Sequence, residues 1–417
     1  MGPRDLLLQL FDAAVAAALP SKCMAGVLPQ RPPGAVTVVG AGKAAAHMAR
    51  ELERQWQGDL HGLVVVPYGH SAACRSIEVI EAAHPIPDAA CVAAARRLLD
   101  TVSNLEEGHT VVCLLSGGGS SLLTLPPPWL TLAQKQHINK QLLQSGAAID
   151  EINCVRKQLS DIKGGKLAAA IYPANVLTYL ISDVPGDDIS VIASGPTVAS
   201  TTSAQDALDV IDRYHVELPA EIRSRIQTAK AVDPARIRGE ARILANTRNA
   251  LQAAAALAAQ NGIEAIVLGE QVGDARELAK QHATLAKDMV AGGGRAVLIS
   301  GGETTVHVTG SGRGGRNGEY ALALAIELGG AAGVSAIACD TDGIDGVGDN
   351  AGSLVTADTL ARARAISLDA VKLQRNNDSY RFFETLGDLV HTGPTGTNVN
   401  DFRAVLVGVD DEFDGRV

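Results

Sequence analysis

The chain is poor in aromatic residues, clustered cations and paired cysteines. Only 3% of its 417 residues are aromatic, so its cores must consist mainly of aliphatic side chains. The formal net charge is -10 and no basic run occurs, which argues against nucleic acid as a partner, because binding phosphates needs clustered Lys and Arg. The six cysteines are scattered without a C-x-x-C pair, as is typical of reduced thiols in a cytoplasmic protein.

Long apolar runs are missing as well. No stretch approaches the length of a membrane span, so we expect no membrane partner. The segment from Leu6 to Leu19 loosely resembles a signal peptide, but Gln9 and Asp12 interrupt it and a strand follows soon after. We therefore predict an amphipathic first helix.

Glycine, in contrast, is abundant. The 43 glycines and the 46% of hydrophobic residues are typical of α/β folds with aliphatic strands and glycine turns at strand ends. The length predicts two domains. The polar stretch 228–242 is the best linker candidate, and a strand at 243–245 is predicted to begin a second α/β series. We place the domains at 1–238 and 239–417, with the first helix able to pack on the other domain.

The first glycine turn follows a short strand at Ala35 to Val39. Its residues Gly40, Gly42 and Lys43 fit the spacing of a dinucleotide-binding turn. However, no carboxylate follows the next strand to bind a ribose, and Lys43 places a cation where it would meet an anionic group. A plain strand-turn-helix with a solvated lysine is the simplest alternative.

A second turn, Ser116 to Ser120, ends the strand at 111–115. Ligands of open α/β sheets bind at this carboxyl end of the strands. The turn is not a Walker A motif, because no Lys-Ser or Lys-Thr follows at the required spacing. Further on, Arg156 and Lys163 belong to a cation-rich segment, 153–167. Either a solvated helix face or a functional bend at its glycine pair explains these charges.

Carboxylates follow two other predicted strands. The strand at 176–181 leads into Asp183 and Asp187, with Ser194 close behind, and the strand at 336–339 leads into Asp342. Mg²⁺ prefers oxygen ligands and is often held by one or two carboxylates plus substrate oxygens. Turn residues or helix caps are the alternative, and Asp183 carries most weight because it follows the strand end closely.

The segment from Ile299 to Leu328 is the richest in signals. We predict a hairpin across Gly301 and Gly302, then a glycine-rich loop with Arg313 and Arg316 that leads into a helix. A helix N-terminus offers N–H groups to an anion, and arginines suit carboxylate or phosphate oxygens. A solvated surface turn is the alternative. Near the C-terminus, the hydroxyl and amide groups of residues 392–401 are suited to binding an anion or a sugar-like substrate. A last strand is predicted at 404–407.

Eight segments between Val38 and Ala404 carry a family resemblance: VVGAGKAA, LLSGGGSSLL, RKQLSDIKGGKLA, SDVPGDDISVIASGPT, ISGGETTV, GSGRGGRNGEYALALA, DTDGIDG and TGPTGTNVNDFRA. They resemble the bacterial glycerate 2-kinases of the MOFRL type, historically also labelled hydroxypyruvate reductase. The resemblance covers nearly the whole chain.

This resemblance implies two three-layer α/β domains, the first Rossmann-like, with the active site in a cleft between them. It implies conversion of D-glycerate and ATP to 2-phosphoglycerate with Mg²⁺ in the cytoplasm, by a protein that could be a homodimer. The implied catalytic residues are Lys43, Asp183 and Arg316, and the metal candidates are Asp183, Asp187 and Asp342. The remaining expected substrate or phosphate contacts are Gly40, Gly42, Ser116, Gly117, Gly118, Gly119, Ser120, Arg156, Lys163, Ser194, Gly301, Glu303, Arg313, Asn317, Thr395 and Asn398.

Two rival functions stay open at this point. One is an NAD(P)H-dependent hydroxypyruvate reductase, motivated by the first glycine turn, although an acid for the ribose is missing. The other is a non-catalytic carboxylate-binding protein.

Overall fold

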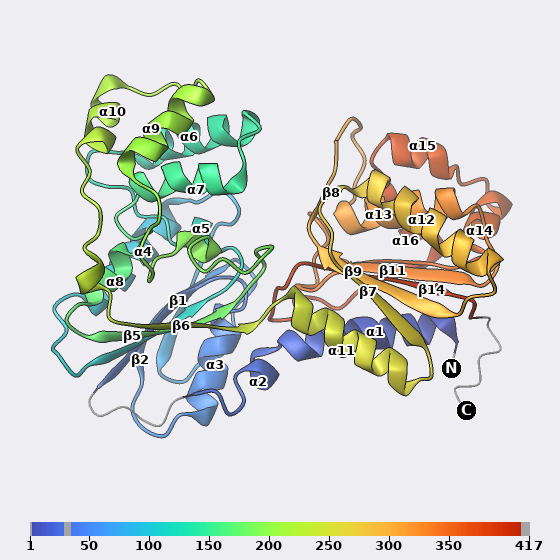
Figure 1. Ribbon diagram of the computed structural model, residues 1–417, viewed down its shortest axis with the longest axis horizontal. Coiled ribbons are helices and arrows are strands. Elements are labelled where there is room, and N and C mark those ends of the chain that lie inside the picture. Colours follow the sequence, from blue (N-terminus) through green and yellow to red (C-terminus); the bar gives the residue numbers. More distant parts are fainter. Residues whose placement is uncertain (1, 29–34, 410–417) are drawn as a thin grey trace. The chain divides into compact units, whose positions relative to one another are not determined.

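The computed structural model describes residues 2–28 and 35–409, which form two compact units. The central unit comprises Cys23–Leu244, and the terminal unit combines Met1–Lys22 with Ala245–Val417. In Figure 1, the terminal unit contains both the first helix, drawn in blue, and the last described strands, drawn in red. Each unit contains a six-stranded sheet.

The sheet of the central unit has the order β3-β2-β1-β4-β5-β6, the strand order of the classic dinucleotide-binding fold. Its strands are β1 (Val36–Ala41), β2 (His61–Pro67), β3 (Ile77–Ala82), β4 (Thr110–Leu115), β5 (Asn175–Ile181) and β6 (Gly239–Ala245). The neighbouring pairs from β3 to β5 are parallel. Every residue of β1 and β4 is buried, as expected for aliphatic strands covered on both faces.

Helices and turns complete the central unit. They are α3 (Ala45–Gln55), α4 (Ala89–Val102), α5 (Gly119–Leu122), α6 (Leu132–Gln144), α7 (Ile149–Gln158), α8 (Lys166–Ile171), η1 (Ile192–Ser194), α9 (Ala204–Arg213), α10 (Ala220–Gln227) and η2 (Pro234–Arg236). The short helix α2 (Pro20–Cys23) spans the boundary between the two units in the sequence. Asp88 caps α4 by accepting a hydrogen bond of 3.0 Å from the Cys91 N–H, as predicted. Figure 1 shows α6, α7, α9 and α10 as one group at the end of this unit beyond α5.

That helical group has an apolar core of its own. Leu142 of α6, Val155 of α7, Ile211 of α9 and Ile226 of α10 are buried together, separately from the core around the sheet. Capping boxes at Thr131 and Ser203 start α6 and α9. The group is therefore a packed body with a core separate from that of the sheet.

The sheet of the terminal unit has the order β13-β12-β11-β14-β9-β7. The strands of this unit are β7 (Glu264–Glu270), β8 (Gly273–Asp274), β9 (Ala296–Gly302), β10 (Thr304–Thr305), β11 (Val334–Asp340), β12 (Gly352–Val355), β13 (Leu389–Val390) and β14 (Asp401–Val407). All pairs in the six-stranded sheet are antiparallel except β7 with β9. The predicted last strand does not lie at an edge: β14 runs between β11 and β9 and is wholly buried.

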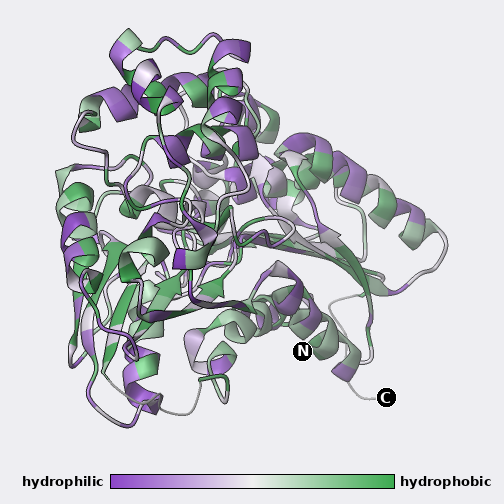
Figure 2. Cartoon of the chain, turned by 60° about the vertical axis from the view of Figure 1, so that its left-hand side comes forward, coloured by the Kyte–Doolittle hydropathy of each residue, from purple (hydrophilic) through white to green (hydrophobic). Residues whose placement is uncertain are grey.

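Helices cover both faces of this second sheet, as Figure 1 shows. One face carries α1 and α11, and the other carries α12 and α13 with the smaller helices. Their bounds are α1 (Pro3–Ala18), α11 (Thr247–Gln260), α12 (Ala275–Ala291), α13 (Arg316–Leu328), α14 (Thr359–Ala365), α15 (Ala370–Arg375) and α16 (Ser379–Leu386). Figure 2 shows green, apolar strands flanked by helices of mixed green and purple.

The first helix belongs to the terminal unit. Leu7 and Leu10 of α1 are fully buried, and the Phe11 ring lies 6.0 Å from the ring of Phe402 in β14. At its end, the Thr397 hydroxyl donates a hydrogen bond of 2.7 Å to the Ala18 carbonyl. The buried and exposed faces of α1 confirm the predicted amphipathic helix. None of the helices within residues 2–28 and 35–409 combines the length and apolar character that a bilayer crossing requires.

Two local predictions were wrong. The strand predicted at 243–245 to open the second α/β series is instead the end of β6, which belongs to the first sheet. The two compact units divide after Leu244. The hairpin predicted across Gly301 and Gly302 does not form, because β10 pairs in parallel with β8 instead of turning back on β9. The chain leaves β9 at Gly302, whose φ of +92° is readily adopted by glycine.

Candidate functional site

Two glycine turns meet at the carboxyl edge of the central sheet. Ala41 of β1 pairs in register with Leu115 of β4, so the turns that follow leave the sheet side by side. The Lys43 N–H donates a hydrogen bond of 2.8 Å to the Gly117 carbonyl, and the Ala44 N–H donates one of 2.9 Å to Ser116 Oγ. These bonds fix the backbone of Lys43 against the Ser116–Ser120 turn.

The glycines of the first turn make this close approach feasible. A Cβ atom on Gly42, whose φ is +135°, would lie 2.2 Å from Ser116 Oγ, and one on Gly40 would lie 2.2 Å from the Leu114 carbonyl oxygen. The space beside these glycines and the Ala44 N–H at the start of α3 are therefore taken by the chain itself. A dinucleotide pyrophosphate would need that space and those donors.

The second turn brings together three residues predicted from distant segments. Ser120 Oγ lies 2.9 Å from Ser194 Oγ, and the Lys163 ammonium donates a hydrogen bond of 2.6 Å to the Ser120 carbonyl. Gly118 lies under the ring of His84, since a Cβ there would be 3.0 Å from the imidazole. The turn residues Ser116, Gly117, Gly118, Gly119 and Ser120, together with Lys163 and Ser194, thus form one connected cluster.

Asp183 follows β5, the next strand along the same edge. Leu180 pairs with Leu115, so Ser182 and Asp183 continue beyond the sheet next to Ser116. Asp183 is half-buried. Asp187 occupies the left-handed region with a φ of 59°, which is a turn geometry. No group of three His, Cys, Asp or Glu side chains arranged for a metal ion occurs within residues 2–28 and 35–409.

A cavity of about 550 Å³ adjoins this edge, between the Ser120 turn and helix α6. Arg156 and Lys163, both predicted from sequence, line it together with Ser120. Lys135 and Asn139 of α6 line it too, and sequence reasoning missed them. Helix α6 reads as a polar, solvated helix (LAQKQHINKQLLQ), and its N-terminal capping box indicates only where it begins, so no local signal marks Lys135 as buried.

In the terminal unit, Arg316 at the start of α13 is enclosed by three carboxylates. Its Nε donates to Asp401 at 2.8 Å, its Nη2 to Asp340 at 2.8 Å and its Nη1 to Glu303 at 2.5 Å. Burial alone would lower the pKa of Arg316, but the three carboxylates outweigh it and the pKa is raised. This guanidinium is a permanent cation with carboxylate partners.

The N-terminus of α13 binds an anion that belongs to the protein. The Asp345 carboxylate accepts hydrogen bonds from the backbone N–H groups of Asn317, at 2.9 Å, and Gly318, at 2.8 Å. Burial raises the pKa of Asp345 to about 6, although these two N–H groups oppose the shift. We predicted that these donors would face a ligand, whereas the structure gives two of them an internal acceptor.

The glycines of the same loop are also explained by the chain's own packing. A Cβ on Gly314 would lie 2.2 Å from Ser379 Oγ, and one on Gly312 would lie 2.4 Å from the Asp378 side chain. Arg313 pairs with Asp349 at 3.1 Å and stacks 3.7 Å from the centre of the Tyr380 ring. The loop is therefore held tightly on residues 376–380 rather than solvated.

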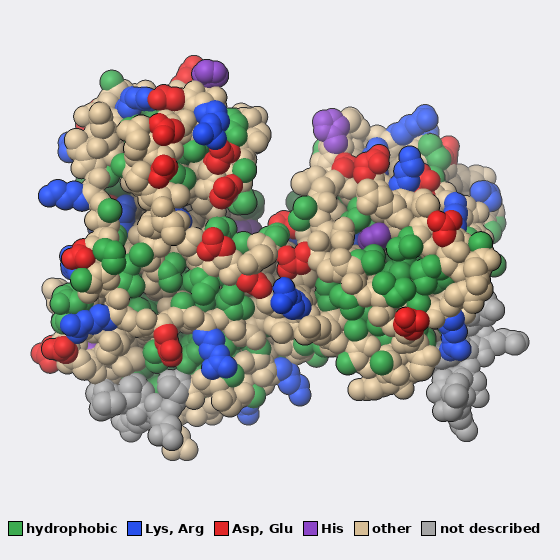
Figure 3. Space-filling view, in the orientation of Figure 1, with side chains coloured by type: hydrophobic (Ala, Val, Ile, Leu, Met, Phe, Trp, Pro, Cys, Tyr) green, Lys and Arg blue, Asp and Glu red, His purple; other side chains and the backbone are tan. Residues whose placement is uncertain are grey.

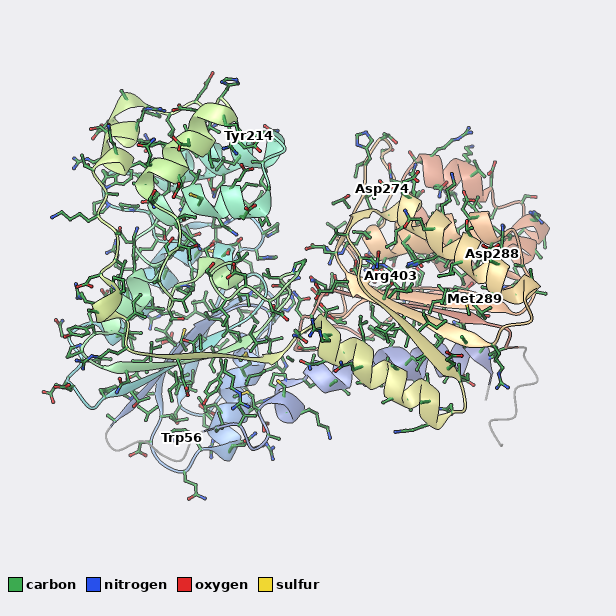
Figure 4. The ribbon with its side chains drawn as sticks, in the orientation of Figure 1. Trp56, Tyr214, Asp274, Asp288, Met289 and Arg403 are labelled. Carbon is green, nitrogen blue, oxygen red and sulfur yellow. The ribbon has the colours of Figure 1, made fainter. Side chains whose placement is uncertain are left out.

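The remaining predicted residues gather around the same acidic centre of the terminal unit. Asn317 Nδ2 donates to Asp401 at 2.7 Å, and the buried Arg403, labelled in Figure 4, donates to the Gly301 carbonyl at 2.9 Å. Thr395 Oγ1 donates to the Thr341 carbonyl at 2.6 Å, and the Thr395 N–H donates to the Asp342 carbonyl. Asn398 and Asp342 are buried nearby in the loops that flank β11 and β14.

Comparison with known proteins places this geometry in a family. A family model described as a domain of unknown function, DUF4147, matches residues 6–227, and the MOFRL family model matches residues 296–401. The D-glycerate 2-kinase of Thermotoga maritima is 38% identical over 97% of this chain and 98% of its own. The chain belongs to the MOFRL family of glycerate 2-kinases.

Other relatives extend the comparison within this glycerate 2-kinase family. The crystal structure of glycerate kinase from Thermotoga maritima superimposes with a TM-score of 0.88 at 37% identity, covering 97% of this chain and 99% of that one. This likeness confirms the predicted α/β class. A protein of Agrobacterium vitis named as a hydroxypyruvate reductase is 48% identical over 97% of this chain and 94% of its own length.

Proposed function

We propose that this protein phosphorylates D-glycerate at its 2-hydroxyl with ATP, giving 2-phosphoglycerate and ADP. The observation that carries the proposal is the coupling of Lys43 to the Ser116–Ser120 turn at the carboxyl edge of a parallel sheet. That turn also contacts the cation-lined cavity through Ser120. Relatives named glycerate kinase that align along nearly the whole chain support it.

In the proposed reaction, the 2-hydroxyl oxygen of glycerate attacks the γ-phosphorus of ATP and the bond to the β,γ-bridging oxygen breaks. ADP leaves, and the hydroxyl proton passes to a base or to water. Such transfers depend mainly on positioning and on offsetting negative charge. Lys43, held by its backbone against the second turn, is assigned to the transferring phosphoryl group, where its ammonium stabilises developing charge.

Asp183 is assigned to the acceptor side of the reaction. It either orients the 2-hydroxyl or holds Mg²⁺, and both roles fit a carboxylate that follows β5 beside Ser116. The side chains of Ser116, Ser182 and Asp183 at this edge offer oxygen atoms, and oxygen is the ligand type that Mg²⁺ prefers. When bound, Mg²⁺ offsets phosphate charge. Asp187 and Asp342 are weaker candidates, since Asp342 Oδ1 already accepts a hydrogen bond from the Ile344 N–H.

Arg316 is assigned to an anionic group of a substrate. Its side chain is 25% exposed. A guanidinium has five N–H groups. Within the described residues, the guanidinium of Arg316 donates only three hydrogen bonds, one to each carboxylate. The guanidinium can therefore bind further oxygens without losing its carboxylate partners. The three carboxylates keep its fork oriented, as the supporting contacts of a functional side chain should.

The rival reductase function is disfavoured by the first glycine turn. Ser116 occupies the space beside Gly42 and accepts the Ala44 N–H, so a dinucleotide pyrophosphate would have to displace it. The strand β2 ends without a carboxylate to bind the ribose. Neither feature hinders the binding of a phosphoryl group by the side chain of Lys43.

One experiment separates the three functions. The purified protein is given D-glycerate, Mg²⁺ and either ATP or NADH with hydroxypyruvate, while ADP release and absorbance at 340 nm are followed. We expect ADP release that depends on glycerate, and signal through enolase without added mutase, which reports the 2-phosphate. Oxidation of NADH without ADP release would refute the proposal, and glycerate binding without either reaction would favour a carboxylate-binding protein. A homodimer stays a prediction for light scattering.

A further inference from the structure

The cavity beside Ser120 lies wholly within the central unit. Its walls come from the loop after β3 (Pro85, Ile86, Pro87), from α5 and the residues after it, and from α6. Arg156 of α7 and Lys163 complete the lining. Its volume of about 550 Å³ lies within the range of small-molecule sites, roughly 300–1,000 Å³. A three-carbon acid would fill only a small part of it.

Lys135, Arg156 and Lys163, which are buried or half-buried, line this cavity without a carboxylate partner among the described residues. Lys135 is 2% exposed and Lys163 is 1% exposed. Within residues 2–28 and 35–409, their ammonium groups donate only to backbone carbonyls, that of Leu159 for Lys135 and that of Ser120 for Lys163. No ion pair involves Lys135, Arg156 or Lys163 in the part of the chain that the structure describes. Burying cations near one another is unfavourable unless an anion accompanies them.

Unsatisfied polar atoms point to the same conclusion. Arg156 Nε and Asn139 Oδ1 are buried and have no hydrogen-bond partner within residues 2–28 and 35–409. Burial, followed by the nearby charges of Arg156 and Lys166, lowers the pKa of Lys135 to about 7, although Asp161 opposes the shift. Asp161 is the carboxyl group that acts on Lys135, and it is itself half-buried. Burial raises the pKa of Asp161 and so disfavours its charged form, which makes it a poor counterion for Lys135.

The other walls suit an apolar, flat group. Ile86, which is 70% exposed, and Leu143, which is 61% exposed, line the cavity with Pro85 and Pro87. An occupant with several negative charges at one end and a flat apolar ring at the other is a nucleotide. Ser120, whose carbonyl binds Lys163, belongs to the turn whose Gly117 carbonyl binds the Lys43 N–H.

We infer that this cavity is the adenine-nucleotide site: Lys135, Arg156 and Lys163 bind the phosphates, the Ile86 and Leu143 walls contact the base, and the terminal phosphate reaches Lys43 along the Ser120 turn. The inference rests on the proposed kinase function for its choice of nucleotide. It assigns Lys135 and Asn139, from a helix that looks solvated in sequence, to ligand binding.

The test measures ADP binding to the full chain by titration calorimetry, without glycerate, for the wild type and for Lys135→Met and Arg156→Met. We expect each substitution to weaken ADP binding by about tenfold or more, the usual effect of losing a hydrogen bond to a charged group. The control is Lys280→Met, a change of an exposed lysine of α12 in the terminal unit, which should leave ADP binding unchanged. Because Met removes a buried charge, Lys135→Met should melt no lower than the wild type without ligand.

Two further arms locate the two ends of the nucleotide. Leu143→Asp, at an exposed wall position, should weaken ADP binding but not the binding of inorganic tripolyphosphate, whereas Lys135→Met should weaken both. In kinetics, Lys135→Met should raise KM for ATP and leave KM for glycerate within twofold.

The inference is overturned if the wild type binds no ADP, if Lys135→Met binds ADP normally, or if only KM for glycerate rises. Failure of the kinase function is a separate outcome. In that case glycerate is not phosphorylated, while ADP binding still depends on Lys135.

Discussion

Removing the Arg316 side chain should lower the free energy of unfolding of the terminal unit, and the structure allows us to estimate by how much. Arg316→Met leaves the carboxylates of Glu303, Asp340 and Asp401 facing one another without their shared cation. Breaking a buried ion pair by deleting one partner costs roughly 3–5 kcal/mol. We expect about 3 kcal/mol, the low end of that range, because Asn317 and Arg403 still donate to Asp401.

Hydrogen exchange on the full chain measures this effect in the right place. A loss of about 3 kcal/mol should speed exchange of β9 and β14 amides roughly 100-fold, if these strands exchange through opening of the whole unit. Both tryptophans, Trp56 and Trp129, belong to the central unit, so their fluorescence reports whether that unit stays intact.

Arg316→Lys is the matched control. It keeps the charge but loses the planar fork that binds three carboxylates at once, so we expect most of the stability to return and most of the activity to stay lost. If Arg316→Met left exchange in β9 and β14 unchanged, the carboxylates would not depend on the guanidinium and our reasoning would be refuted. If Arg316→Met also kept normal kcat/KM, its assigned role in the reaction would be wrong.

Three further predictions concern single positions. Lys43→Ala should lower kcat by about 100-fold or more while ADP binding changes little, and near-normal kcat would remove Lys43 from the mechanism. Gly42→Ala should lower the melting temperature strongly, because its Cβ would lie 2.2 Å from Ser116 Oγ. The control is Gly69→Ala, where φ is also positive (+80°) but no atom lies within 4 Å of the added Cβ, so only backbone strain should lower the melting temperature. Equal effects of the two substitutions would contradict the packing argument. The pKa of Asp345, about 6, is raised above its ordinary value of 3.8, so this carboxyl stabilises the fold below pH 4 and loses that contribution as pH rises through 6. Relative to Asp345→Asn, the wild type should therefore lose roughly 2.5 kcal/mol of unfolding free energy between pH 4 and pH 7.5 by chemical denaturation. Parallel pH curves for the two proteins would refute the shift.

Charge on the molecule agrees with a small anionic substrate rather than a polymer. On the face drawn in Figure 3, blue Lys and Arg side chains are interspersed with red Asp and Glu. The cations that we assign to binding instead line the cavity beside Ser120. A small ligand can enter a cavity of that size, whereas a nucleic acid backbone would need the cations at the surface.

The sequence by itself determined the local geometry of the site. Aliphatic runs ending in glycine predict buried strands followed by turns, and both β1, before Lys43, and β4, before Ser116–Ser120, follow that rule. Such patterns act over a few residues, through strand burial and backbone freedom, so they can be recognised without tertiary structure. The family resemblance added the assignment of Lys43, Asp183 and Arg316 to one reaction.

Tertiary structure alone decided what those turns contact. Asp345 occupies the α13 N–H groups from 28 residues away, and Lys135 is buried because α6 packs on α7 and over the Ser120 turn. Likewise, β6 continues the first sheet although its sequence reads as the start of a new series. These outcomes depend on long-range packing. The partner of a charged group or of a strand is distant in the sequence, so the residues next to that group or strand do not indicate which partner it has.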